Sequence, residues 1–185
     1  AEFFAAAQKA GDKWNYGSVG NGSVAHLGME LLKSRAPGLA PVHVPYQGNA
    51  PVITAMLGGQ IQLSLIPPGL AMPQVKAGKL RAIGVTSARS SALVPEVPSL
   101  TDAGVRDFNL EVWTALIGPA NLPKIAQDKL SAEVAKIYSD TDMQRKLLAS
   151  GWQPVGSTPE GLRQRVRDEA ALLGNIISAR GIKLD

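Results

Sequence analysis

The sequence predicts an α/β fold, in which a parallel-rich sheet is flanked by helices and followed by a C-terminal helical extension. Three observations predict it. Up to Thr86, short runs rich in Val, Ile and Leu alternate with stretches whose apolar residues recur at helical spacing. Tight Gly or Pro turns separate them, which is typical of strand–helix–strand units. From Pro123 onward the apolar residues recur only at helical spacing.

Short apolar runs bounded by turn residues mark the expected strands. The first four belong to the strand–helix alternation, and the last is a longer run that leaves at Gly118-Pro119. The expected strands are Trp14–Ser18, Pro41–Tyr46, Gln60–Ile66, Leu80–Thr86 and Asn109–Gly118.

Helical spacing and end signals such as Gly11 and Pro37-Gly38 mark the expected helices. Ser157 and Glu160 have the spacing of a capping box at the start of the last helix. A buried stripe is expected along that helix at Leu162, Val166, Ala170, Leu173 and Ile177. The expected helices are 1–10, 24–35, 50–57, 68–76, 123–138, 141–149 and 158–180.

A glycine-rich bend joins the first strand to the second helix. Gly17, Gly20 and Gly22 allow positive φ and close approach, and Ser23, or alternatively Asn21, can cap the helix. The first N–H groups of a helix have no partner within it and lie at the positive end of its dipole. The bend therefore suits an anion, either phosphate or carboxylate.

Composition excludes several function classes. The 185 residues carry a net charge of +4, but the basic residues are scattered and aromatic residues make up only 5%. No basic, aromatic surface for nucleic acid is expected. The chain has no Cys and two His, which excludes a disulfide framework and a thiolate site. We expect neither a metal nor a cofactor.

Three interpretations of the bend compete. A nucleoside-triphosphate loop needs Lys followed by Ser or Thr after its last Gly, but Ser23-Val24 follows Gly22. The run Gly20–Ala25 fits the G-x-G-x-x-A dinucleotide pattern, but the next strand ends in Pro45-Tyr46-Gln47 without the acid that holds the ribose. A carboxylate held by backbone N–H groups and the Ser18 and Ser23 hydroxyls needs neither residue.

Binding without turnover is the favoured function, because no nucleophile or acid–base pair accompanies the strand ends. We therefore expect no enzyme. A nucleotide-binding, Rossmann-like oxidoreductase domain and the effector domain of a transcription regulator stay open as alternatives.

His26 either contacts the ligand or orients the bend through a backbone bond, whereas His43 is expected to be structural. The candidate ligand-binding residues are Ser18, Gly20, Asn21, Gly22, Ser23, His26, Tyr46 and Gln47.

A set of motifs in order carries a resemblance over nearly the whole chain. The motifs are 16–23 with His26-Leu27, 43–48, 57–61, 77–82, 97–100 with 103–105, and 158–160. On these motifs the chain resembles the substrate-binding proteins of tripartite tricarboxylate transporters, the Bug or TctC family. Gln47 departs from the family pattern, where Lys is common, and so does Ile66-Pro67-Pro68, where a more polar segment is usual.

The resemblance implies a periplasmic, two-lobed receptor of the type II periplasmic-binding-protein kind that closes on an organic acid and delivers it to membrane permease subunits. Residues 1–110 would be the second-lobe α/β ligand-binding domain. Residues 111–185 would be a crossover strand and C-terminal helices that pack on a first lobe preceding this chain. We therefore expect a processed or truncated chain whose uncovered helices promote self-association.

Overall fold

The computed structural model describes residues 2–183. The chain forms two compact units, one made of Ala1–Glu111 with Leu173–Asp185 and one made of Val112–Leu172. No helix within residues 2–183 is long and apolar enough to cross a membrane.

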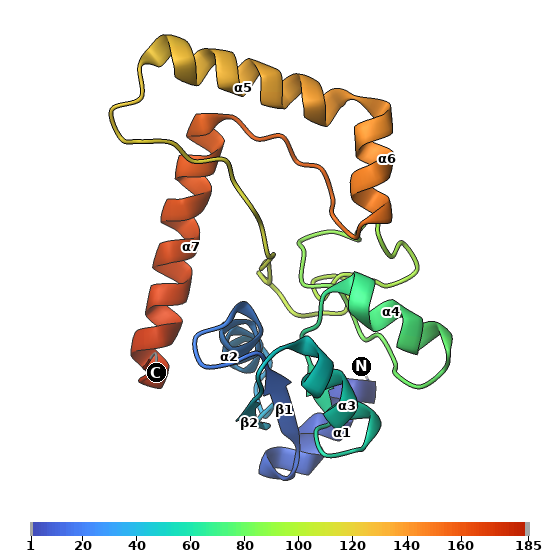
Figure 1. Ribbon diagram of the computed structural model, residues 1–185. Coiled ribbons are helices and arrows are strands. Elements are labelled where there is room, and N and C mark those ends of the chain that lie inside the picture. Colours follow the sequence, from blue (N-terminus) through green and yellow to red (C-terminus); the bar gives the residue numbers. More distant parts are fainter. Residues whose placement is uncertain (1, 184–185) are drawn as a thin grey trace. The chain divides into compact units, whose positions relative to one another are not determined.

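The first unit is built on a small parallel sheet. Its strands are β1 (Asn15–Ser18), β2 (Val42–Pro45) and β3 (Leu63–Ser64), in the order β2-β1-β3. The helices of this unit, seen around the strands in Figure 1, are α1 (Glu2–Ala10), α2 (Val24–Arg35), α3 (Asn49–Leu57) and α4 (Pro68–Lys76), with a 3₁₀ turn at Gly11–Lys13. The predicted parallel sheet flanked by helices is confirmed.

The alternation of side chains along β1 places α2 and α3 on opposite faces of the sheet. Tyr16 and Ser18 lie on one face, where Tyr16 bonds Glu30 of α2. Gly17 lies on the other face, where a Cβ would stand 3.1 Å from Val52 of α3 and 2.4 Å from Ile61 Cδ1. The expectation of positive φ was wrong for Gly17, which is a strand residue and is needed for this close packing.

Two predicted strands are absent from the described part of the chain. Segment 80–86 forms only an isolated bridge, Val85 to Ser99, and 109–118 pairs with no strand. Their apolar composition fits a strand, but a strand also needs a neighbouring strand with which it forms a ladder of hydrogen bonds. Here Val85 N–H bonds the carbonyl of Pro98 and Leu110 N–H bonds that of Thr86, so the backbone is satisfied in irregular structure.

The second unit is helical. It contains α5 (Lys124–Ser139), α6 (Thr141–Ala149) and the part of α7 (Pro159–Arg180) up to Leu172, close to the predicted bounds. The hydroxyl of Thr158, rather than that of the expected Ser157, accepts from Gly161 N–H at the start of α7. The predicted buried stripe on α7 was wrong in part, because Val166 is 45% exposed and the buried residue is Ile176.

Candidate functional site

The carboxyl ends of the three strands lie at one edge of the sheet, because the strands are parallel. Each strand is followed by a helix, so the N-termini of α2, α3 and α4 all begin from this edge. In open α/β sheets this edge is where ligands bind. The bend 19–23 follows β1 here, and Tyr46 and Gln47 follow β2.

The bend after β1 has the predicted conformation at two of its glycines. Gly20 has φ +124° and Gly22 has φ +71°, a region that favours glycine. Ser23, and not Asn21, is the N-cap of α2: its hydroxyl accepts from His26 N–H at 3.3 Å and donates to the carbonyl of Gly20 at 2.7 Å. The Ser23 hydroxyl therefore closes the bend onto the helix.

Some backbone N–H groups of the bend are already used within the protein. Gly20 N–H donates to Ser18 Oγ and Gly22 N–H donates to His26 Nδ1, each at 3.1 Å. The N–H groups of Val24 and Ala25, in the first turn of α2, have no partner within residues 2–183. These two groups are thus the donors that α2 has left for a ligand.

Ser18 supports the bend from within the protein. Its side chain is fully buried, and its Oγ lies 2.6 Å from His43 Nε2 and 3.0 Å from the carbonyl of Gly20. The serine therefore connects β1, β2 and the bend through one hydroxyl group.

Three aromatic rings stack beside Ser18. Tyr16 and His43 are register partners on neighbouring strands, and their ring centroids are 4.9 Å apart. The ring of His43 in turn stacks on that of His26, with centroids 3.9 Å apart and planes at 11°. Burial, followed by the proximity of His26, lowers the pKa of His43 to about 4, and burial also lowers the pKa of His26. Both imidazoles are therefore neutral at pH 7.

A buried carboxylate anchors the other end of the stack. Glu30 is 6% exposed and accepts from the Tyr16 hydroxyl at 2.9 Å and from Lys33 Nζ at 2.7 Å, and Arg180 Nε lies 3.2 Å from its second oxygen. Burial alone would raise the pKa of Glu30, but hydrogen bonds from Lys33 and Tyr16 hold it below the usual value. Burial and the carboxylate of Glu30 raise the pKa of Tyr16, which stays a neutral donor.

The two candidates after β2 differ in exposure. Tyr46 is half-buried and packs against the apolar cluster of Val52, Ala55 and Ile61, and its N–H donates to the carbonyl of Ser18. Gln47 is exposed at the same edge. Tyr46 thus covers the core edge, whereas Gln47 is open to a ligand.

Sequence reasoning missed the part played by Tyr16 and Glu30. The available signal was a Glu in the middle of a helix whose other residues in that part are apolar, because such a carboxylate must find partners when buried. The predicted structural role of His43 matches its position between Tyr16 and His26.

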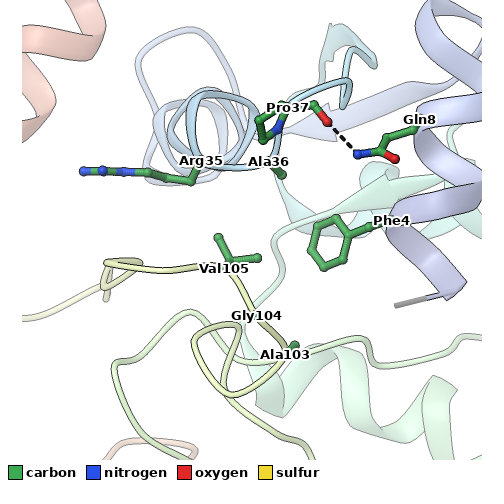
Figure 2. A pocket seen from close by; sticks show the side chains of 8 residues that line it. All are labelled: Phe4, Gln8, Arg35, Ala36, Pro37, Ala103, Gly104 and Val105. Carbon is green, nitrogen blue, oxygen red and sulfur yellow. Dashed lines mark hydrogen bonds between the residues drawn. The ribbon is translucent and has the colours of Figure 1, made fainter.

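A separate hollow of about 240 Å³ is lined by residues of α1, the end of α2 and segment 103–105. Arg35 is the charged residue in its lining, and the Arg35 side chain extends away from the others (Figure 2). Gln8 Nε2 donates to the carbonyl of Pro37 at 2.6 Å. The hollow therefore lacks converging groups that would hold an anion. Its lining is Phe4, Gln8, Arg35, Ala36, Pro37, Ala103, Gly104 and Val105.

Comparison with known families decides the class of protein. The family model described as "TctC: Tripartite tricarboxylate transporter family receptor" matches residues 1–182. The chain belongs to the TctC receptor family. The resemblance seen in the motifs is thereby confirmed.

Curated relatives of this TctC chain come from several bacteria. It is 30% identical to a UPF0065 protein of Agrobacterium vitis over 98% of this chain and 53% of that protein. It is 29% identical to protein BugT of Bordetella pertussis over 88% of this chain and 50% of that protein. The chain therefore spans about half the length of these relatives.

Solved TctC-type structures share the fold. An R. palustris protein, Rpa4515, determined with adipate, is 26% identical with a TM-score of 0.81, over 100% of this chain and 61% of that one. MatC from Rhodopseudomonas palustris with bound malate is 26% identical with a TM-score of 0.72, over 95% and 60%. The structure of a periplasmic transporter is 32% identical with a TM-score of 0.78, over 100% of this chain and 61% of that one.

Proposed function

We propose that the chain is the ligand-binding part of an extracytoplasmic receptor that holds a small organic anion, a carboxylate, in the periplasm and passes it unchanged to the membrane permease subunits of a tripartite tricarboxylate-type transporter. In this proposal residues 1–110 form the second-lobe ligand-binding domain, and the chain performs no chemistry. Within residues 2–183 no group of three or more His, Asp or Glu is placed to hold a metal ion.

One observation carries the proposal: among the described residues 2–183, the N–H groups of Val24 and Ala25 have no partner at the N-terminus of a 12-residue helix. Unpaired N–H groups and the positive end of the helix dipole favour a negative charge there. Two of the similar solved structures contain adipate and malate, which are both dicarboxylates, and this supports a carboxylate as the anion.

The candidate residues take different roles in this proposal. The Gly20 and Gly22 φ angles shape the bend, while Ser18, Ser23 and His26 hold it through the hydrogen bonds described above. The carboxylate accepts from Val24 N–H and Ala25 N–H. The proposed ligand surface is completed at the same edge of the sheet by Asn21, Gln47 and the part of the half-buried Tyr46 that faces solvent.

Replacement of Val24 by proline tests the N–H donors directly. Val24 is the first helical residue, where proline is tolerated, and Ser23 has φ −62° and ψ 158°, which suits a residue before proline. Val24→Pro therefore removes one N–H without breaking α2. We expect its affinity for adipate or malate to fall by about tenfold or more, the scale of a lost charge-assisted hydrogen bond.

The matched control is Val24→Ala, which removes the same side chain but keeps the N–H. It should bind within about threefold of the wild type. A second pair compares Ser23→Ala, expected to weaken binding by about 1 kcal/mol or more, with Ser34→Ala at the far end of the same helix. Calorimetric titration of the complete gene product with a panel of di- and tricarboxylates gives these affinities.

Two results would overturn the proposal. One is a folded, complete gene product that binds none of the organic acids in the panel. The other is Val24→Pro binding as tightly as Val24→Ala. Saturable binding of NADH in the same assay would instead support the dinucleotide interpretation of the bend.

A further inference from the structure

Two neutral imidazoles stack directly beside the bend. The ring of His26 comes from α2 and that of His43 from β2, and their centroids are only 3.9 Å apart. Tyr16 stacks on the outer face of His43 at 4.9 Å, and its hydroxyl is fixed by Glu30. The pair is therefore held between the sheet and α2, and neither ring turns without disturbing the stack.

Each imidazole of the pair fixes one glycine N–H of the bend. His26 Nδ1 accepts directly from Gly22 N–H, and His43 bonds Ser18 Oγ, which accepts from Gly20 N–H. Because His26 Nδ1 is an acceptor, it carries no hydrogen, and the neutral ring has its hydrogen on Nε2. A proton on Nδ1 would set two N–H donors against each other and break the contact with Gly22.

The surroundings of the pair disfavour a positive charge. Burial is the main cause that lowers both pKa values, and the cation of Lys33 adds to it. The carboxylate of Glu30 acts in the opposite direction, but it is already bonded to Lys33 and Tyr16 and lies near Arg180. Two imidazolium rings at 3.9 Å would also repel each other.

We propose that His26 and His43 are the positioning residues of the anion-binding bend, and that the bend binds its carboxylate only while Nδ1 of His26 carries no proton. This inference rests on the proposed function of the bend. In this proposal His26 acts through its hydrogen bond with Gly22 and the geometry of the bend, and it places no positive charge against the ligand.

The direction of the pH effect separates positioning from charge. If His26 were a cationic ligand contact, acidification would strengthen binding of an anion. If it positions the bend as a neutral acceptor, acidification weakens binding, because protonation of Nδ1 releases Gly22. The window lies below 6.5, the ordinary pKa of His, because burial lowers both values.

A nuclear magnetic resonance titration of the complete wild-type protein tests the hydrogen bond without any ligand. The chain has two His, so single variants assign both rings. We expect the Gly22 amide resonance to shift with the same midpoint as the His26 ring, below pH 6.5, and His43 to titrate near pH 4. A Gly22 amide that stays unchanged while His26 titrates would overturn the inference.

Two variants of His26 test the effect on binding of adipate. His26→Asn offers Oδ1 in place of Nδ1 but takes up no proton, and His26→Leu offers no acceptor. At pH 7 we expect His26→Leu to lose about tenfold in affinity and His26→Asn to recover most of it. Below pH 6.5 the affinity of the wild type for adipate should fall relative to that of His26→Asn. Protonation of adipate itself affects both affinities equally and therefore cancels in their ratio.

The results that would overturn this inference differ from those that would overturn the proposed function. Wild-type affinity that rises relative to His26→Asn on acidification, or His26→Leu binding as tightly as His26→Asn, would overturn the inference. A wild-type protein that binds no organic acid at any pH would overturn the proposed function instead, and the resonance titration would then decide the positioning role alone.

Discussion

The hydroxyl of Tyr16 donates a hydrogen bond to the buried carboxylate of Glu30 at 2.9 Å, which joins the central strand of the sheet to the middle of α2. The same carboxylate is bonded to Lys33 and lies 3.2 Å from Arg180. A buried charge is tolerated only when it is paired in this way. Glu30 thus fixes the helix whose first turn forms the candidate site.

Removal of the Glu30 carboxylate should destabilise the protein strongly. Glu30→Ala leaves Tyr16 and Lys33 without their acceptor, and we expect a loss of about 3 kcal/mol in the free energy of unfolding. Glu133→Ala, which breaks an exposed pair with Lys136, should change it by less than about 0.5 kcal/mol. Urea denaturation measures both. Equal effects of the two variants would contradict the anchoring role of Glu30.

The contact between Gly17 and Ile61 makes a second prediction. Gly17→Ala places a Cβ 2.4 Å from Ile61 Cδ1, so we expect a loss of about 1–3 kcal/mol from overpacking. Ile61→Val removes Cδ1, and the double variant should therefore be more stable than Gly17→Ala alone. The coupling is obtained from a double-mutant cycle of unfolding free energies. Strictly additive effects would disprove it.

Acidification should lower stability through His43. Its pKa is about 4 in the folded protein and about 6.5 when unfolded, so the unfolded state binds more protons between these values. The stabilisation is fully present above pH 6.5 and is lost as the pH falls toward 4. We expect the melting temperature to drop over this window and to drop less in His43→Gln. An identical pH profile for both proteins would contradict the burial of a neutral His43.

Exposed apolar side chains in the second unit lead to a prediction about assembly. Ile117 is 85% exposed and Ile125 is 84% exposed, and such residues are usually covered when they form patches. We expect the 185-residue chain alone to self-associate, and Ile117→Glu with Ile125→Glu to reduce this. Sedimentation velocity at several concentrations measures it. A wild-type monomer at all concentrations would refute the expectation.

The sequence predicts those parts of the fold that local signals define. Ser23 caps α2 as expected, since a Ser before an apolar helical pattern is a local signal. Gly20 and Gly22 take positive φ as expected, because glycines in a tight bend are also a local signal. The bounds of α5, α6 and α7 also follow from short-range spacing and turn residues.

The remaining features depend on partners that lie far away along the chain. Segment 80–86 looks like a strand, but no ladder forms for it and Val85 bonds Pro98 instead. In the sequence Gly17 resembles a flexible turn residue. In the structure it must be glycine because Ile61 leaves no room for a Cβ. The stack of Tyr16, His43 and His26 depends on strand register, which sequence spacing alone does not provide.

The buried imidazoles also matter to anyone who would move this glycine bend into another scaffold, for instance to build a sensor. A transplant of residues 17–26 alone would leave out His43, which supports the bend from β2 through Ser18, and Glu30, which holds Tyr16 from further along α2. The smallest portable unit is therefore β1, α2 and β2 together, with their register intact.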